Sequence, residues 1–523
     1  MEFSETMENH SYISEALNHI ASNPSIVLLS TCFLLIYLYF RMAHTYWESR
    51  GVPQDNPSFP FGDMASVIFR RQNLASKLKQ VYDRARAQGH KYVGLYFFSR
   101  KAILLVDPVL IRAFLAHFHN RGLYYDEKND PLSAHLFSLY GPKWKRLRTK
   151  LAPAYSPKQL RGMFGVMLDC GLKLRDILGE NAGKGQPLEI RETIGRYTMD
   201  VIGSCAYGLE CNTMLNPDAE FRLMGKRAFT QTVGDLLRII IIRSFPKLAG
   251  ILRIGIFSSN VTSFFRRVVR ETITYRVENK VRRDDFLQIL IQLMDNVDLD
   301  VPSGATAGSA LTMDEAAAQA FIFFLAGFET TSTTTSFAIF EMAMNDEIQE
   351  KARSEVKRVF EKHGGVWSYD AVQELTYLDM VLQETLRKYP AAPVFIRKCT
   401  ENYYIPDSNV LIEEGVDILV PCFALHRDPE YFPNPDRFDP DRFAEQENRP
   451  KIWDYAYIPF GDGPRICIGM RFAMLQMKIT LSILLQNYVF HINSKTNLPI
   501  VMEKKGILLS PIGGIWMNLE SVQ

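Results

Sequence analysis

A single cysteine near the C-terminal end stands in a loop suited to a metal-binding thiolate. Residues 460–469 read FGDGPRICIG, so Cys467 lies between small turn-forming residues and the start of an amphipathic segment. Glycines let the backbone approach a flat macrocycle, and amides at a helix start can stabilise a negatively charged sulfur. Arg465 can donate to a haem propionate, and Phe460 precedes the cysteine by seven positions. We therefore expect Cys467 to be an axial ligand of haem iron.

The other cysteines carry no such pattern. The sequence holds seven cysteines, scattered and without a Cys-x-x-Cys pair. This distribution argues against a disulfide framework or a zinc site and favours a reducing compartment. A lone cysteine is often only a small buried side chain, an interpretation that fits Cys32, Cys170 and Cys205.

A second candidate site lies in the middle of a predicted long helix. Thr312-Met313-Asp314-Glu315 is a capping-box sequence, and the residues after it are apolar almost all round, as in a helix at the centre of a core. Residues 326–331, AGFETT, interrupt it with a glycine, an acid and two hydroxyls. A mid-helix glycine costs about 1 kcal/mol relative to alanine, and a buried carboxylate costs more.

An oxygen site accounts for these costs better than a core does. The small pair makes room beside a metal, and a threonine hydroxyl can bond back to a carbonyl and bend the helix. Glu329 and Thr330 are then placed to relay protons to dioxygen. The alternative is a kinked structural helix in which Glu329 forms a salt bridge.

Trp144 and Arg148 lie one turn apart on a predicted helix, where they share a face and can both meet a haem propionate. A core tryptophan beside an exposed arginine is the alternative. Positive charge gathers around them at Lys143, Lys145, Arg146, Arg148 and Lys150. Such a run is usually a solvated face, but beside a haem it also suits docking of an acidic electron donor, which we favour.

Glu384 and Arg387 share a face of a helix predicted over residues 377–389, so they can pair. Alone, this spacing says little, because exposed helices contain many such pairs. It gains weight from Pro440-Asp441-Arg442-Phe443, which supplies a second arginine shortly before the cysteine loop.

These motifs occur together and in one order: W-x-x-x-R, A-G-x-E-T-T, E-x-x-R, P-D-R-F and F-x-x-G-x-R-x-C-x-G. In them the chain resembles the cytochrome P450 superfamily, and in GVP…PSFPFG and LHRDPEYFPNPDRFDPDRF it resembles insect microsomal cytochromes P450 of family 6. The resemblance implies a cytochrome P450 fold, mainly α with small β-sheets, in a single large domain. It also implies that Glu384, Arg387 and Arg442 form a buried structural network and that Arg397 is a further propionate partner.

The resemblance further implies a monooxygenase that inserts one oxygen atom of O2 into an apolar xenobiotic, insecticide, lipid or hormone. The expected cofactor is haem b. Electrons are expected from NADPH through a separate NADPH–cytochrome P450 reductase, with cytochrome b5 as a second candidate donor. The candidate pocket residues are Leu136, Phe137, Phe324 and Val394. A reductase-independent haem-thiolate isomerase or dehydratase and a non-enzymatic haem- or lipid-binding protein are the rival functions.

An apolar run near the N-terminus predicts a membrane anchor over residues 25–47. Residues 26–40 carry no charge, but a span needs about 20 residues, so we expect Tyr46 and Trp47 to complete it at the interface. Glutamates precede the run and arginines follow it, which predicts a luminal extension over residues 1–24 and a cytosolic catalytic domain on the endoplasmic reticulum. Asn9 heads a glycosylation pattern there. A cleaved signal peptide and a buried core helix are the alternatives.

The remaining chain is predicted to form a proline-rich connector over residues 48–62 and one haem-thiolate domain over residues 63–523. Two strands are expected over 92–98 and 102–106, much helix between 142 and 362, and a strand-rich patch over 403–421. Residues 295–311 are expected to form an exposed loop. The net charge of +2 gives no sign of nucleic-acid binding.

Overall fold

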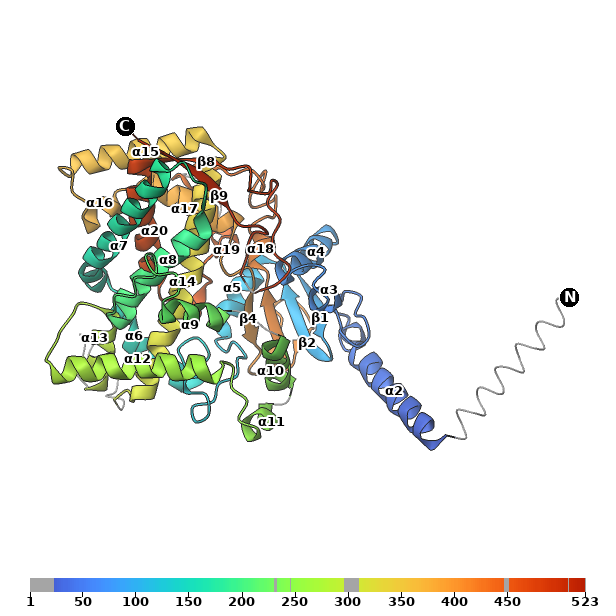
Figure 1. The fold of residues 1–523 in the computed structure, drawn as a ribbon. Helices are drawn as coiled ribbons and strands as arrows, with labels where there is room; N and C mark the ends of the chain where they lie inside the picture. Colours follow the sequence, from blue (N-terminus) through green and yellow to red (C-terminus); the bar gives the residue numbers. More distant parts are fainter. Residues whose placement is uncertain are drawn as a thin grey trace.

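The computed structural model describes residues 23–229, 233–244, 246–295, 310–445, 451–506 and 508–522. In this part of the chain helices predominate, and the strands form three small sheets. Figure 1 shows most helices gathered on one side of the molecule and the largest sheet on the other. The predicted class, mainly α with small β-sheets, is confirmed.

The helices follow the predicted distribution, with most of the segment between residues 142 and 362 helical. Before that segment lie α2 (Pro24–Ala43), α3 (Ala65–Ile68), α4 (Leu74–Ala87) and α5 (Pro108–His117). Within it lie α6 (Gly141–Leu151), α7 (Pro157–Gly183), α8 (Ile190–Ile202), α9 (Glu220–Phe229), α10 (Val233–Ser244), α11 (Pro246–Ile251), α12 (Ser259–Glu278), α13 (Phe286–Met294), α14 (Met313–Ala343) and α15 (Asp346–Lys362). After it come α16 (Tyr369–Gln373), α17 (Thr376–Lys388), α18 (Cys422–Leu425), α19 (Lys451–Ala456) and α20 (Met470–Asn487).

The largest sheet joins strands that lie far apart in the sequence. Its order is β1 (Tyr92–Phe97), β2 (Arg100–Leu105), β7 (Asp417–Val420) and β4 (Phe395–Lys398). β2 and β7 run parallel, and the other neighbours are antiparallel. The smaller sheets are β3 (Leu188–Glu189), β9 (Trp516–Ser521) and β8 (Tyr488–Ile492), and the pair β5 (Tyr403–Tyr404) and β6 (Leu411–Ile412). Both predicted strands near residue 100 and the patch after residue 403 are therefore present.

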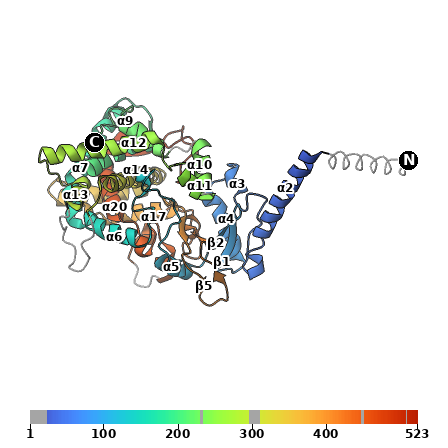
Figure 2. The ribbon, with the colours of Figure 1, turned by 90° about the horizontal axis from the view of Figure 1, so that it is seen from below.

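α14 is the central helix of the helical side. Thr312 and Glu315 make both hydrogen bonds of the predicted capping box, at 3.2 and 2.8 Å. Beyond its first turn the helix buries side chains on most faces, and α8, α12, α17 and α20 all pack against it. Figure 2 shows α14 surrounded by other helices. A largely apolar surface is what such a position requires, because most faces of the helix pack against other helices.

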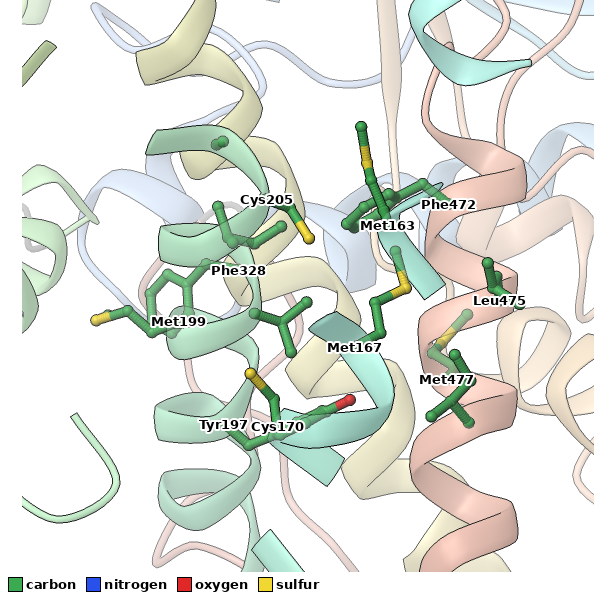
Figure 3. Close-up of a cluster of buried hydrophobic side chains, with 14 of the residues drawn as sticks. Met163, Met167, Cys170, Tyr197, Met199, Cys205, Phe328, Phe472, Leu475 and Met477 are labelled. Carbon is green, nitrogen blue, oxygen red and sulfur yellow. The ribbon is translucent and has the colours of Figure 1, made fainter. Parts of the chain in front are cut away.

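A sulfur-rich cluster packs α7, α8, α14 and α20 together (Figure 3). Its side chains include Met163, Met167, Cys170, Tyr197, Met199, Cys205, Phe328 and Met477. Methionine is flexible and fills irregular gaps between helices. Burial raises the pKa of the Cys170 thiol to about 12 and that of Cys205 higher still, so both stay neutral. These two are the small buried side chains that the sequence suggested, whereas Cys32 is exposed on α2.

The exposed apolar helix near the N-terminus ends earlier than predicted. α2 has twenty residues and none of them is buried, a length of about 30 Å that matches the hydrocarbon core of a bilayer. Tyr46 and Trp47 do not extend it to an interface. Trp47 is fully buried, with its ring nitrogen donating to the Leu95 carbonyl at 3.2 Å. The side chains of Tyr46 and Trp47 pack in the core of the sheet side because the chain turns back onto β1 after Ala43.

Two predictions fall partly or wholly outside the described residues. The luminal extension with Asn9 precedes residue 23, and most of the predicted loop over residues 295–311 lies in the gap after residue 295.

Candidate active site

The Cys467 loop is fixed by its own backbone and by close packing on α5. The Cys467 N–H donates to the Phe460 carbonyl at 3.0 Å, which closes the loop. Gly463 has φ +69°, and a Cβ there would lie 2.5 Å from the carbonyl oxygen of Leu115. Only glycine permits this approach. The loop therefore presents Cys467 immediately before α20, with Gly469 as the residue that caps the helix.

Opposing influences act on the Cys467 sulfur. Its surface is accessible to solvent, but protein surrounds it closely enough that burial raises the pKa of the thiol. The Gly469 N–H, which bonds to the sulfur, and the charges of Arg121 and Arg148 lower the pKa of Cys467 in turn. An accessible sulfur inside the protein, facing an amide and two guanidiniums, is suited to hold a metal as a thiolate.

Arg465 holds the loop to the segment before α6. Its guanidinium donates to the carbonyls of His119, at 2.7 Å, Leu136, at 3.0 Å, and Leu139. It also lies 4.0 Å from the centre of the Trp144 ring, a stacked cation–π contact. The predicted partners Trp144 and Arg465 are therefore brought together.

Four arginines converge beside Cys467: Arg121, Arg148, Arg397 and Arg465. We call them the arginine cluster. Arg148 donates to the Ile466 carbonyl at 2.9 Å, and Arg121 donates to the Arg465 carbonyl at 3.3 Å. Arg397 is 2% exposed, and its Nε has no hydrogen-bond partner. No ion pair within the described ranges joins any of the four to a carboxylate.

The charges of the arginine cluster disfavour one another. Burial, with the positive charges of Arg397 and Arg148, lowers the pKa of Arg465 to about 9, and burial alone lowers that of Arg397 to about 10. Burial and the neighbouring arginines also lower the pKa of Arg121 well below its ordinary value. A guanidinium stays protonated near neutral pH, so the cluster keeps an uncompensated positive charge. An anionic ligand can neutralise this buried positive charge.

The predicted back-bonding of a threonine hydroxyl is present in the middle of α14. The Thr330 hydroxyl donates to the Ala326 carbonyl at 2.5 Å, and the side of the helix at Ala326 is exposed. One turn earlier, the Phe323 ring lies 5.2 Å from Phe472 at the start of α20. The AGFETT segment therefore lies near the helix that follows Cys467.

Glu329 does form a salt bridge, as the alternative prediction required. Its carboxylate pairs with Arg191 from the first turn of α8. Both side chains keep partial contact with solvent, at 18% and 27% exposure. Arg191 was not predicted, because a single arginine in a helix carries no spacing signal toward a residue far along the chain. The same holds for Arg121, which lies in a loop.

The predicted pocket residues fall in different environments. Leu136 is 9% exposed, and its N–H donates to Gln319 of α14 at 2.9 Å. Phe137 is 46% exposed and lies beneath Arg121, 3.7 Å from the guanidinium carbon to the ring centre. Val394 is half-buried on the sheet side. Phe324 is fully buried among aromatic rings.

Glu384, Arg387 and Arg442 form the predicted network, here called the Glu384 network. Arg387 grips both oxygens of Glu384 at 2.6 and 2.8 Å, with both side chains fully buried, and Arg442 adds a contact at 3.3 Å. Arg387 also donates to the His426 carbonyl at 3.0 Å. The neutral ring of His426, whose pKa burial lowers to about 3, accepts from the Ile458 N–H at 3.0 Å. The network thus holds the segment just before the Cys467 loop.

Comparison with known proteins agrees with this arrangement. The sequence model of the cytochrome P450 family matches residues 59–517. The chain is 37% identical to "Probable cytochrome P450 6a14" of Drosophila melanogaster over 95% of this chain and 99% of the relative. It is 38% identical to "Probable cytochrome P450 6a20" from the same fly, again over 95% of this chain and 99% of that relative. The chain belongs to the cytochrome P450 family. It is therefore a haem-thiolate monooxygenase.

The residues of this cytochrome P450 fit the haem group that the family implies. Haem carries two propionate groups, and the arginine cluster offers the anion-binding donors that the protein itself leaves without a carboxylate. The Arg397 Nε without a partner is one such donor. The Cys467 sulfur offers the soft ligand for iron.

Proposed function

We propose that this cytochrome P450 oxidises apolar small molecules with electrons that NADPH supplies through a separate reductase. The observation that carries the proposal is the uncompensated arginine cluster beside an accessible cysteine sulfur. Bound haem supplies the activation of dioxygen and the oxidation of a C–H bond. The chain's own residues hold the group, deliver protons and exclude water.

In this proposal the Cys467 sulfur would hold the haem iron, and the Gly469 amide stabilises that sulfur as a thiolate. The arginine cluster would hold the propionates, with Trp144 beneath the Arg465 guanidinium. Phe460 supports the loop from its other side, where it lines a surface hollow of about 450 Å³. The Glu384 network is structural, since it fixes the segment that leads into the loop.

Glu329 and Thr330 are proposed to deliver protons. The Thr330 hydroxyl is bonded back to the carbonyl of Ala326, a residue on the exposed side of α14. A hydroxyl there can accept a proton and pass it on. Thr330→Ala should retain haem but lower the amount of product formed per NADPH, because the hydroxyl that delivers protons is missing.

The substrate is proposed to be an apolar xenobiotic, insecticide or endogenous lipid or hormone. Leu136 and Phe137, in the segment between α5 and α6, and Val394, just before β4, are the side chains we place on the substrate side. An apolar lining is what binding pockets for such molecules generally have.

The reductase is proposed to dock against the exposed basic residues of α6 and those of the hollow behind the Cys467 loop. Lys143, Lys145 and Arg146 are exposed on α6, and Arg471 on α20 lines the hollow. Complementary charge speeds encounter with an acidic donor. Cytochrome b5 fits the same description. With α2 as the anchor, Arg41 in its last turn supports a cytosolic catalytic domain on the endoplasmic reticulum.

A carbon monoxide difference spectrum of the purified protein, with and without reductase and NADPH, tests the proposal. The thiolate-type Soret band is expected, together with NADPH consumption that depends on substrate. Cys467→Ala should abolish the band, and Cys170→Ala is the matched control that should keep it. A normal band without NADPH consumption on any substrate would favour an isomerase, a dehydratase or a non-enzymatic binding protein. Absence of the band would overturn the proposal.

A further inference from the structure

Arg191 is the cation that the structure pairs with Glu329. The guanidinium contacts one carboxylate oxygen of Glu329, and its Nη1 donates to the Ser510 hydroxyl at 2.7 Å. Its Nε is buried without a hydrogen-bond partner. Arg191 thus joins the first turn of α8, the middle of α14 and the C-terminal loop, which we define as residues 508–515.

The backbone around Arg191 is fixed from both sides. Glu189 caps α8 by accepting from the N–H groups of Arg191, at 3.3 Å, and Glu192, at 2.6 Å. The same carboxylate accepts from the Ile515 N–H at 2.8 Å. Glu189 and Ile515 therefore hold the start of α8 against the C-terminal loop, and Arg191 projects from a rigid junction. A rigid support is what a positioning residue needs.

The acid nearest to Arg191 along α8 already has cation partners of its own. Glu192, the acid next along α8, is paired with Arg196 at 3.0 Å and Lys226 at 2.8 Å, and also with Arg222. Within the part of the chain that the structure describes, Arg191 is the cation that forms an ion pair with Glu329.

The acid and the hydroxyl of α14 are not bonded to each other. The Thr330 hydroxyl donates to the Ala326 carbonyl, while Glu329 faces Arg191. Both members of the ion pair retain solvent contact, so water can reach the carboxylate at the junction of α8 and the C-terminal loop. This is the geometry of a proton entry point with a fixed carboxylate.

We infer that Arg191 is a positioning residue: it fixes the Glu329 carboxylate where α8 and the C-terminal loop meet α14, and protons enter the site there. The inference rests on the proposed role of Glu329 in proton delivery. In this inference Arg191 acts through Glu329.

Turnover of the haem-loaded full-length protein with reductase tests this inference. In Arg191→Gln, product formed per NADPH should fall by roughly three- to tenfold, since a misplaced catalytic group loses rate, while KM stays unchanged. Arg191→Lys should recover part of the loss, because it keeps the cation but not the second donor that reaches Ser510. Arg196→Gln is the matched control, an arginine of the same helix paired with Glu192, and should resemble the parent protein.

Epistasis with Glu329 decides whether Arg191 acts through that residue. Arg191→Gln combined with Glu329→Gln should be no worse than Glu329→Gln alone. An additional loss in the double variant, or a raised KM that lysine does not rescue, would overturn the inference.

Unfolding gives a readout that does not need turnover. The thermal midpoints of the two single variants and the double variant should be non-additive if the ion pair forms. Additive midpoints would overturn the inference by themselves. If the parent protein consumed no NADPH with reductase, the proposed function would fall, and this cycle would still decide whether Arg191 holds Glu329.

Discussion

Two buried groups of arginines in this cytochrome P450 differ in whether the protein supplies the counter-anion. In the Glu384 network, a carboxylate with no exposed surface accepts from both Arg387 and Arg442. In the arginine cluster beside Cys467, four guanidiniums face backbone carbonyls, an aromatic ring and one another. The first group is complete within the polypeptide. The second is complete only with a ligand that brings negative charge.

Asp130 shows why the difference matters for cations in particular. This carboxyl is 2% exposed and has no cation partner among the ion pairs of the described residues. Burial raises the pKa of Asp130 to about 6, so the acid can take up a proton and lose its charge. An arginine cannot lose its charge in this way, because it stays protonated. A buried unpaired acid can therefore be structural, whereas buried unpaired arginines indicate a binding site for an anion.

The largest effect on stability is expected from replacing Glu384, the anion of the Glu384 network. Glu384→Gln leaves the buried Arg387 without its anion and should lower the free energy of unfolding by about 3–5 kcal/mol. Denaturant unfolding in detergent, with and without added haem, measures it. The loss should be similar in both conditions. A loss seen only with haem would mean that the network serves the cofactor.

Replacing an arginine of the arginine cluster should stabilise the haem-free protein but weaken the retention of haem. Arg397→Met removes an uncompensated buried charge, so the haem-free protein should gain about 1–2 kcal/mol in stability. The haem-loaded protein should lose haem about tenfold more readily, because one charge-assisted contact is missing. Haem transfer to apomyoglobin measures retention. If the haem-free variant were less stable than the parent, Arg397 would be structural in the manner of Arg387.

Asp130 should make stability depend on pH. Its pKa is raised in the folded state to about 6 by burial, so the stabilisation is present at low pH and is lost as pH rises through 6. Between pH 5 and pH 7.5 the parent protein should lose about 1–2 kcal/mol relative to Asp130→Asn. Thermal unfolding at the two pH values compares them. Equal pH dependence in both proteins would show that Asp130 keeps its charge.

The smallest effect on stability is expected for Arg442, at the partly exposed edge of the Glu384 network. The Arg442 side chain is 12% exposed, and Arg387 still neutralises Glu384 when Arg442 is replaced. Arg442→Gln should therefore cost about 0.5–1 kcal/mol, measured as for Glu384→Gln. A loss as large as that of Glu384→Gln would show that the three residues act as one unit.

Much of this site could be predicted from sequence because its motifs are local. The capping box of α14, the pairing of Glu384 with Arg387 and the back-bonded hydroxyl of Thr330 each depend on residues within four positions. Such spacings fix which side chains share a helix face. The Cys467 loop was predictable for the same reason, since its turn and its helix start adjoin in the chain.

What the sequence missed depends on contacts between distant segments. Trp47 follows an apolar run and suggested a membrane interface, but it is buried against β1. Phe324 suggested a pocket wall, and its ring lies within an aromatic cluster. Apolar side chains fit lipid, substrate and core equally well, so composition alone could not assign them.

The sequence by itself determined the family, the cysteine loop and the acid and hydroxyl in the middle of α14, because each is written in short spacings that backbone geometry converts into shared faces. Only the tertiary structure decided where the charges meet. Arg121 joins the arginine cluster from a loop, and Arg191 reaches Glu329 from another helix. Electrostatic energy depends on distance and burial in space, and neither is recorded in the order of residues along the chain.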